Sequence, residues 1–96
     1  MSALNHINEK YKHSDLTAKI IGSAMEVHKI LGNGFQEVIY QRALSIEMAN
    51  RKINFSREHT MELTYKGNNI GTRRVDFFVD EKVMVEIKAV SKFEDV

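Results

Sequence analysis

The sequence contains no cysteine, no proline and no tryptophan, and it has almost no net charge, since 14 Lys and Arg residues face 13 Asp and Glu residues. The absence of cysteine excludes a disulfide framework and a thiolate zinc site. A net charge of +1 lacks the basic excess of proteins that bind nucleic acid through overall charge. No segment reaches the ~18 consecutive apolar residues that cross a bilayer, so we expect no membrane association.

The composition that remains is that of one small globular domain. Of the 96 residues, 43% are hydrophobic and 28% are charged, which suits one modest core and excludes a second domain. Residues 1–12 lack the apolar run of a signal peptide. Because the absence of cysteine also suits a reducing compartment, we expect a cytoplasmic protein.

Two helices are predicted in the first half of the chain. Residues 1–13 are mostly polar and aperiodic, which predicts a flexible arm ahead of a single domain at 14–96. From Ser14, apolar residues recur at three- and four-residue steps, which predicts a helix that ends at Gly32. The same periodicity predicts a second helix over about 35–50, so the two helices form a hairpin.

The second half of the chain has the pattern of strands. The hydrophobic period falls to two over about 53–66, which predicts a strand with one solvated face. A Gly-Asn-Asn turn leads to a second strand at about 70–79, and a third is predicted at about 83–90. The expected fold is therefore α+β, a two-helix hairpin followed by a three-stranded antiparallel meander.

The third predicted strand is the most apolar of the three, yet only residues 91–96 follow it. Such a strand normally lies inside a sheet with both faces covered. Two interpretations stay open: another copy of the chain completes the sheet as a homo-oligomer, or the sequence is a fragment of a longer domain.

Four residues form the candidate site. Asp76 is an acid inside an apolar strand, where an unpaired buried carboxylate costs several kcal/mol. Glu86 and Lys88 are two residues apart and share a strand face. Glu37 begins the second helix on the stripe of Tyr40, Gln41 and Leu44. Carboxylates suit Mg²⁺ or Mn²⁺, and a metal with a nearby ammonium suits phosphodiester hydrolysis.

The connection at 80–82 decides whether the strand residues meet. With these three residues as the loop, Val79 pairs with Val83 and Asp76 lies opposite Glu86. A two-residue loop sends Asp76 to the other face of the sheet. The loop contains no glycine, so turn chemistry does not choose between the two.

Each candidate also has an ordinary structural interpretation. Glu37 is favoured at a helix start by the macrodipole, whatever the protein does. Glu86 and Lys88 suit a solvated strand end. Asp76 also suits an ion pair with a neighbouring arginine, Arg73 or Arg74.

Two motifs carry a family resemblance. Asp76, followed on the next strand by Glu86-Ile87-Lys88, resembles the Asp…(Asp/Glu)-x-Lys signature of the PD-(D/E)XK nuclease superfamily. The segment from Gly34 to Tyr40, with Glu37 between them, resembles the motif of the GxxExxY family within that superfamily. The likeness extends over roughly residues 20–90.

The resemblance implies a restriction-endonuclease-like core and a metal-dependent nuclease acting on DNA or RNA. It implies Asp76 and Glu86 as ligands of Mg²⁺ or Mn²⁺, Lys88 as the catalytic lysine and Glu37 as the acidic residue from the helix. Val75 stands where the signature has proline, and the last core helix and strand of the family have no counterpart. The alternative expectation is a catalytically inactive interaction or oligomerisation module.

Overall fold

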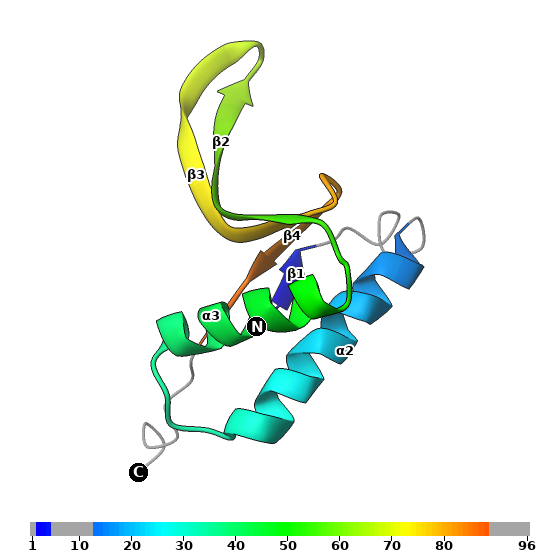
Figure 1. The fold of residues 1–96 in the computed structure, drawn as a ribbon. Coiled ribbons are helices and arrows are strands. Elements are labelled where there is room, and N and C mark those ends of the chain that lie inside the picture. The colour runs from blue at the N-terminus through cyan, green and yellow to red at the C-terminus, as the bar shows by residue number, and fades with distance from the viewer. Residues whose placement is uncertain (1, 5–12, 89–96) are drawn as a thin grey trace.

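A computed structural model describes residues 2–4 and 13–88 (Figure 1). Its helices and strands, in chain order, are β1 (Ser2–Leu4), α2 (Ser14–Leu31), α3 (Glu37–Asn50), β2 (Phe55–Tyr65), β3 (Asn68–Val79) and β4 (Val83–Glu86). The strands form one antiparallel sheet in the order β1-β4-β3-β2. The predicted α+β arrangement of two helices followed by a three-stranded meander is confirmed.

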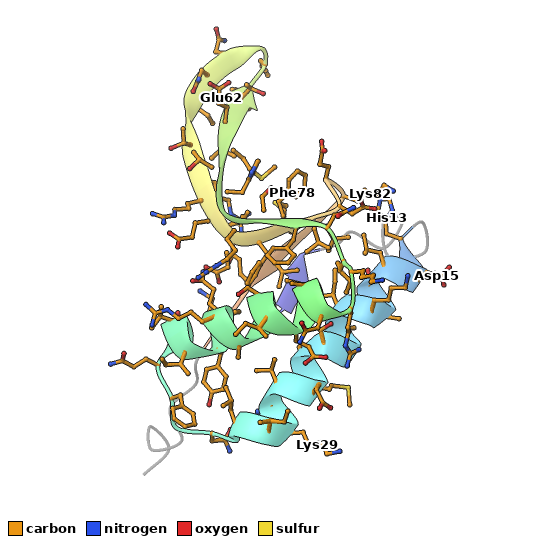
Figure 2. All side chains as sticks on the ribbon, in the orientation of Figure 1. His13, Asp15, Lys29, Glu62, Phe78 and Lys82 are labelled. Atoms are coloured by element: carbon orange, nitrogen blue, oxygen red, sulfur yellow. The ribbon has the colours of Figure 1, made fainter. Side chains whose placement is uncertain are left out.

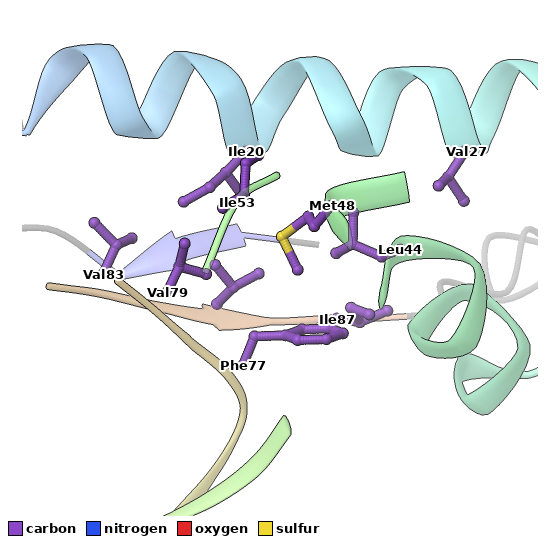
Figure 3. Packing of buried hydrophobic residues seen from close by; sticks show 10 residues of the cluster. Ile20, Val27, Leu44, Met48, Ile53, Phe77, Val79, Val83 and Ile87 are labelled. Carbon is purple, nitrogen blue, oxygen red and sulfur yellow. The ribbon is translucent and has the colours of Figure 1, made fainter. Parts of the chain in front are cut away.

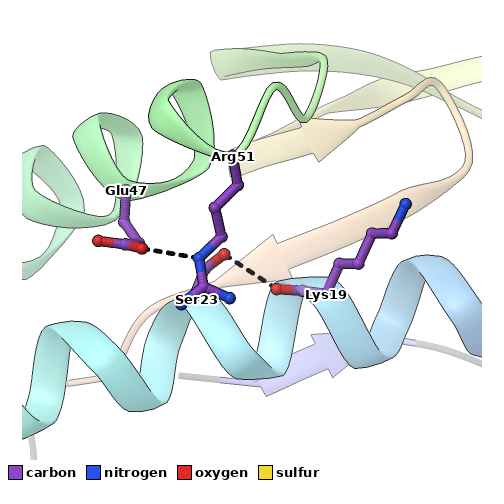
Figure 4. A network of polar contacts seen from close by, with 4 residues as sticks. All are labelled: Lys19, Ser23, Glu47 and Arg51. Carbon is purple, nitrogen blue, oxygen red and sulfur yellow. Dashed lines mark hydrogen bonds and ion pairs between the residues drawn. The ribbon is translucent and has the colours of Figure 1, made fainter.

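The two helices form the predicted hairpin. Helix α2 ends at Gly32, whose N–H donates to the carbonyl of His28 at 2.8 Å. Gly32 has a positive φ of 71°, a conformation that glycine adopts easily. Near the other end of the hairpin, Gly22 lets Arg51 approach: a Cβ at this glycine would lie 3.1 Å from Nη1 of Arg51. Arg51 is itself held by Glu47 at 2.7 Å, so the helices pack closely at this point (Figure 4).

The core lies between the helix pair and one face of the sheet (Figure 3). Alternate residues of β3 and of the following strand point toward the helices, as the two-residue period requires. Phe77 packs at the centre of this layer with no exposed surface. The members that surround it in the core are Ile20, Val27, Leu44, Met48, Ile53, Val79, Val83, Val85 and Ile87.

Within the predicted N-terminal arm, Ser2–Leu4 form a short strand, β1, beside β4. Ala3 lies opposite Val85 in an antiparallel register, so this edge of β4 is paired within the chain. The physical reason is that β4 is apolar and central, and an unpaired edge would leave its backbone groups without partners. A three-residue strand is too short to produce a periodicity. Residues 5–12 of the predicted arm lie outside the described residues.

The third strand is shorter than predicted, since β4 ends at Glu86. The N–H of Ile87 donates to the side chain of Asp76 at 2.6 Å, so this amide is bonded to a carboxylate at the point where the strand ends. The last predicted strand residues, 89 and 90, lie outside the described residues.

The hairpin of β2 and β3 bends away from the sheet and projects from the body of the molecule (Figure 1). Arg57 pairs with Phe77 and His59 pairs with Val75, but Glu58 and Asp76, which lie between these two pairs, do not form a pair in the register. Glu58 has a positive φ of 50°, which marks the bend. Figure 2 shows Glu62 far out on the projecting part, away from the helices.

Among the described residues, no helix has the length and apolar character needed to cross a membrane.

Candidate functional site

Asp76 lies on β3 at the bend where the hairpin leaves the sheet. One carboxylate oxygen, Oδ2, accepts the Ile87 N–H at 2.6 Å, and the other, Oδ1, accepts the side-chain amide of Gln41 at 3.3 Å. These donors compensate a half-buried charge, as the sequence required. The ion pair with Arg73 or Arg74 is not formed, because these arginines pair with Glu86 and Glu58.

The register confirms the three-residue loop. Val79 pairs with Val83, Phe78 with Met84 and Phe77 with Val85, and the observed pairing of the two strands ends there. Asp80 and Glu81 adopt positive φ values of 52° and 54°, which supply the turn shape without glycine. Because side chains alternate along a strand, Asp76 and Glu86 have the parity of Phe78 and Met84, which pair directly.

Glu86 is engaged by a neighbouring cation. Its carboxylate forms an ion pair with the guanidinium of Arg73 on β3, and its side chain is 22% exposed. Lys88 follows two residues later and is exposed. In this structure, Arg73 is thus the counter-ion of Glu86.

Glu37 stands in the first turn of α3, beside Asp76. Together with Val38 and Gln41 of the same helix, the two acids line an open pocket of about 310 Å³. The structure thus brings Glu37 and Asp76 to one pocket, whereas Glu86 and Lys88 are not among the residues that line it.

Tyr40 connects α3 to the loop before it. Its hydroxyl donates to the carbonyl of Gly32 at 2.5 Å and accepts the N–H of Phe35 at 3.3 Å. The aromatic rings of Tyr40 and Phe35 also meet edge to face, with centroids 6.1 Å apart. Tyr40 therefore holds the loop at 32–36, and with it the start of the helix that carries Glu37.

Sequence reasoning assigned no role to Gln41, although it placed this residue on the stripe of Glu37. Gln41 donates to Asp76 and accepts from Arg57 Nη2 at 2.8 Å. The stripe was the available signal, because residues four apart lie on one helix face. No sequence pattern indicated the contact between Gln41 and Arg57, because it joins a helix to a strand through two long side chains.

The donor types suit a hard divalent cation, since the acids present oxygen ligands. Among residues 2–4 and 13–88, no three His, Asp or Glu side chains gather closely enough to hold an ion between them. Mg²⁺ is commonly held by one or two carboxylates and keeps several waters. Asp76 and Glu86 fit that pattern, provided that Glu86 leaves Arg73.

Comparison with known proteins gives one match. A family model described as the PD-(D/E)XK nuclease superfamily matches residues 14–96. No curated protein and no solved structure matches the chain. The matched range contains both helices and the strands β2, β3 and β4, with Asp76 inside β3 and Glu86 at the end of β4. On this match over most of its length, the chain belongs to the PD-(D/E)XK nuclease superfamily.

Proposed function

We propose that this protein is a metal-dependent nuclease that hydrolyses phosphodiester bonds of DNA or RNA. The observation that carries the proposal is the β3–β4 register, in which Val79 pairs with Val83 and Phe77 with Val85. It gives Asp76 and Glu86 the same parity, and Lys88 follows Glu86 by two residues. Members of the superfamily typically use divalent metals, and two carboxylates on one sheet face are suitable ligands for one. We place its action in the cytoplasm.

In this proposal, Asp76 and Glu86 hold Mg²⁺ or Mn²⁺. A bound ion of this class activates water and neutralises charge on a phosphoryl group. Lys88 orients the attacking water or stabilises the charge that develops on the phosphoryl oxygens, as a positioned cation does. Glu37 contributes a further acidic group from the pocket that it shares with Asp76.

We also assign the chain to the GxxExxY family of the superfamily. Gly34, Glu37 and Tyr40 match its motif, and the contacts of Tyr40 give the spacing a physical sense. The tyrosine closes the loop that contains the glycine, and the glutamate follows that loop at the start of α3. The glutamate thereby reaches the same pocket as Asp76.

The test is cleavage of plasmid and single-stranded nucleic acid in the presence of Mn²⁺. We expect wild type to cleave, and Lys88→Ala to cleave about a hundredfold more slowly because a charge-stabilising group is lost. Mn²⁺ binding by Lys88→Ala, measured by calorimetry, should stay near that of wild type, since a lysine ammonium is not a metal ligand.

Lys29→Ala is the matched control, because Lys29 is exposed in the last turn of α2 and is not among the residues that line the pocket of Asp76. It should cleave as wild type does. Cleavage that persists unchanged in Lys88→Ala would indicate a contaminating nuclease and would contradict the proposal.

The alternative function is a catalytically inactive interaction or oligomerisation module, a homo-oligomer of nuclease fold. Exposed apolar side chains on the helices favour it: Ile21 is 47% exposed, Met25 67% and Ile46 63%. The outer edge of β2 is also open in the described sheet. Both features are suited to contact with a second copy.

For this alternative, light scattering should give a solution mass of twice 11.1 kDa or more. Met25→Glu should lower that mass to the monomer value, because it places a charge in the apolar contact, whereas Lys29→Glu should leave it unchanged. A monomeric mass of wild type at every concentration would contradict the homo-oligomer.

A further inference from the structure

We propose that Gln41, oriented by Arg57, is a positioning residue that holds the Asp76 carboxylate for a cation. The inference rests on the proposed function, in which Asp76 is a metal ligand. It concerns a chain of three side chains from three elements, β2, α3 and β3, which meet at the bend of the hairpin.

The orientation of the Gln41 amide is determined by its two partners. The guanidinium of Arg57 has only donors, so the atom 2.8 Å from its Nη2 must be the amide oxygen. An ionised carboxylate has only acceptors, so the amide nitrogen must face Oδ1 of Asp76, 3.3 Å away. Arg57 therefore keeps the Gln41 NH₂ group directed at Asp76.

The carboxylate is consequently held from two sides. The backbone N–H of Ile87 binds Oδ2, and the Gln41 amide binds Oδ1. Each carboxylate oxygen has two acceptor positions, so both oxygens keep one for a metal ion. A ligand restrained in this way loses less conformational freedom on binding, which favours affinity.

The neutral amide also separates two charges. A guanidinium in direct contact with Asp76 would act as a counter-ion and compete with a metal, as Arg73 does at Glu86. With Gln41 between them, Arg57 contributes to positioning without forming an ion pair with the ligand. Asp76 is thus the prepared ligand, whereas Glu86 becomes available when Arg73 moves.

The test compares Mn²⁺ affinity, measured by calorimetry, in wild type, Gln41→Met and Arg57→Met. Methionine keeps an unbranched side chain of similar length but has no amide. We expect Gln41→Met to bind Mn²⁺ about tenfold more weakly, the loss typical of a removed outer-shell partner. Gln36→Met, an exposed glutamine just before α3, is the control and should bind as wild type does.

The role of Arg57 is tested by a double-mutant cycle. If Arg57 acts through the amide, Gln41→Met with Arg57→Met should bind no more weakly than Gln41→Met alone. Wild-type affinity in Gln41→Met, or fully additive losses in the double variant, would overturn the proposal. Urea unfolding of each variant checks that the fold is retained.

A metal-free measurement separates this inference from the proposed function. Hydrogen exchange at the Ile87 amide, followed by NMR, reports on its bond to Asp76 without any ion. Exchange severalfold faster in Gln41→Met, with other amides unchanged, supports positioning, and unchanged exchange overturns it. A wild type that binds no Mn²⁺ would overturn the nuclease proposal, while the exchange result would still decide the positioning role.

Discussion

Asp76→Asn is expected to weaken Mn²⁺ binding and to slow the proposed metal-dependent cleavage by at least about a hundredfold, because the proposed metal ligand, which would contribute several kcal/mol, is lost. Asparagine keeps the size of the side chain and an oxygen that accepts the Ile87 N–H, which now lies 2.6 Å from Asp76. The variant removes the negative charge, and a neutral amide oxygen is a much weaker ligand of a divalent ion than a carboxylate.

The neighbourhood of Asp76 makes the substitution specific. The Gln41 amide nitrogen faces Oδ1 from 3.3 Å, and Arg57 keeps Gln41 from turning its oxygen there. An asparagine that accepts from Ile87 must then direct its own NH₂ group at another donor. We therefore expect a small loss of stability in addition to the loss of metal binding, both measurable on one preparation by urea unfolding and calorimetry.

Asp80→Asn provides the matched control. Asp80 is on the β3–β4 turn, where its carboxylate lies 3.3 Å from the ammonium of Lys82 and both side chains are about half exposed. The same chemical change there should leave Mn²⁺ affinity and cleavage unchanged, since exposed ion pairs contribute little. Equal effects of the two substitutions would show that the metal does not depend on Asp76.

Phe77→Ala, one residue further along β3, is expected to lower the free energy of unfolding by about 3–5 kcal/mol. The ring is fully buried and meets Phe55 edge to face, with centroids 5.6 Å apart. Truncation removes apolar contacts and leaves a cavity beneath the helix pair (Figure 3). Since a domain of this size has a total stability of about 5–15 kcal/mol, the variant loses a large part of it.

Phe78→Ala makes the same change as Phe77→Ala at a less buried position, so it tests the effect of burial. Phe78 is the next residue, half-buried on the opposite face of the sheet, where its ring lies 5.0 Å from that of His59. We expect a loss of no more than about 1.5 kcal/mol, because much less apolar surface is removed from water there. Urea unfolding of both variants measures the difference, and similar losses would contradict the placement of the core on the Phe77 face.

Most of the fold follows from local patterns. The three- and four-residue steps of α2 and α3 place Ile20, Leu44 and Met48 on buried faces. The two-residue period of β3 separates Phe77 from Phe78. These patterns can be recognised in the sequence because helix and strand geometry repeats every few residues. A short segment therefore contains all the information needed to predict its secondary structure and its buried face.

The candidate site was predictable in part. The alternation along β3 left two registers open, and the observed pairing of Val79 with Val83 selects the one with a three-residue loop at 80–82. The stripe on α3 was sufficient to expect Glu37 on the side of the sheet, and it shares a pocket with Asp76. The roles of Asp76 and Glu86 as metal ligands and of Glu37 as a further acidic group are proposals that the experiments above test.

By itself, the sequence determined the order and type of the two helices and the meander and the faces that they bury. The pairing of Val79 with Val83, which sets the parity of Asp76 and Glu86, was decided by the structure. Only the tertiary structure decided that Ser2–Leu4 pair with β4, that the hairpin bends at Asp76, that Arg73 binds Glu86 and that Gln41 links Arg57 to Asp76. The reason is physical. Helix and strand periods depend on neighbouring residues, whereas pairing of edges and long charged side chains depends on which distant segments the fold brings within reach.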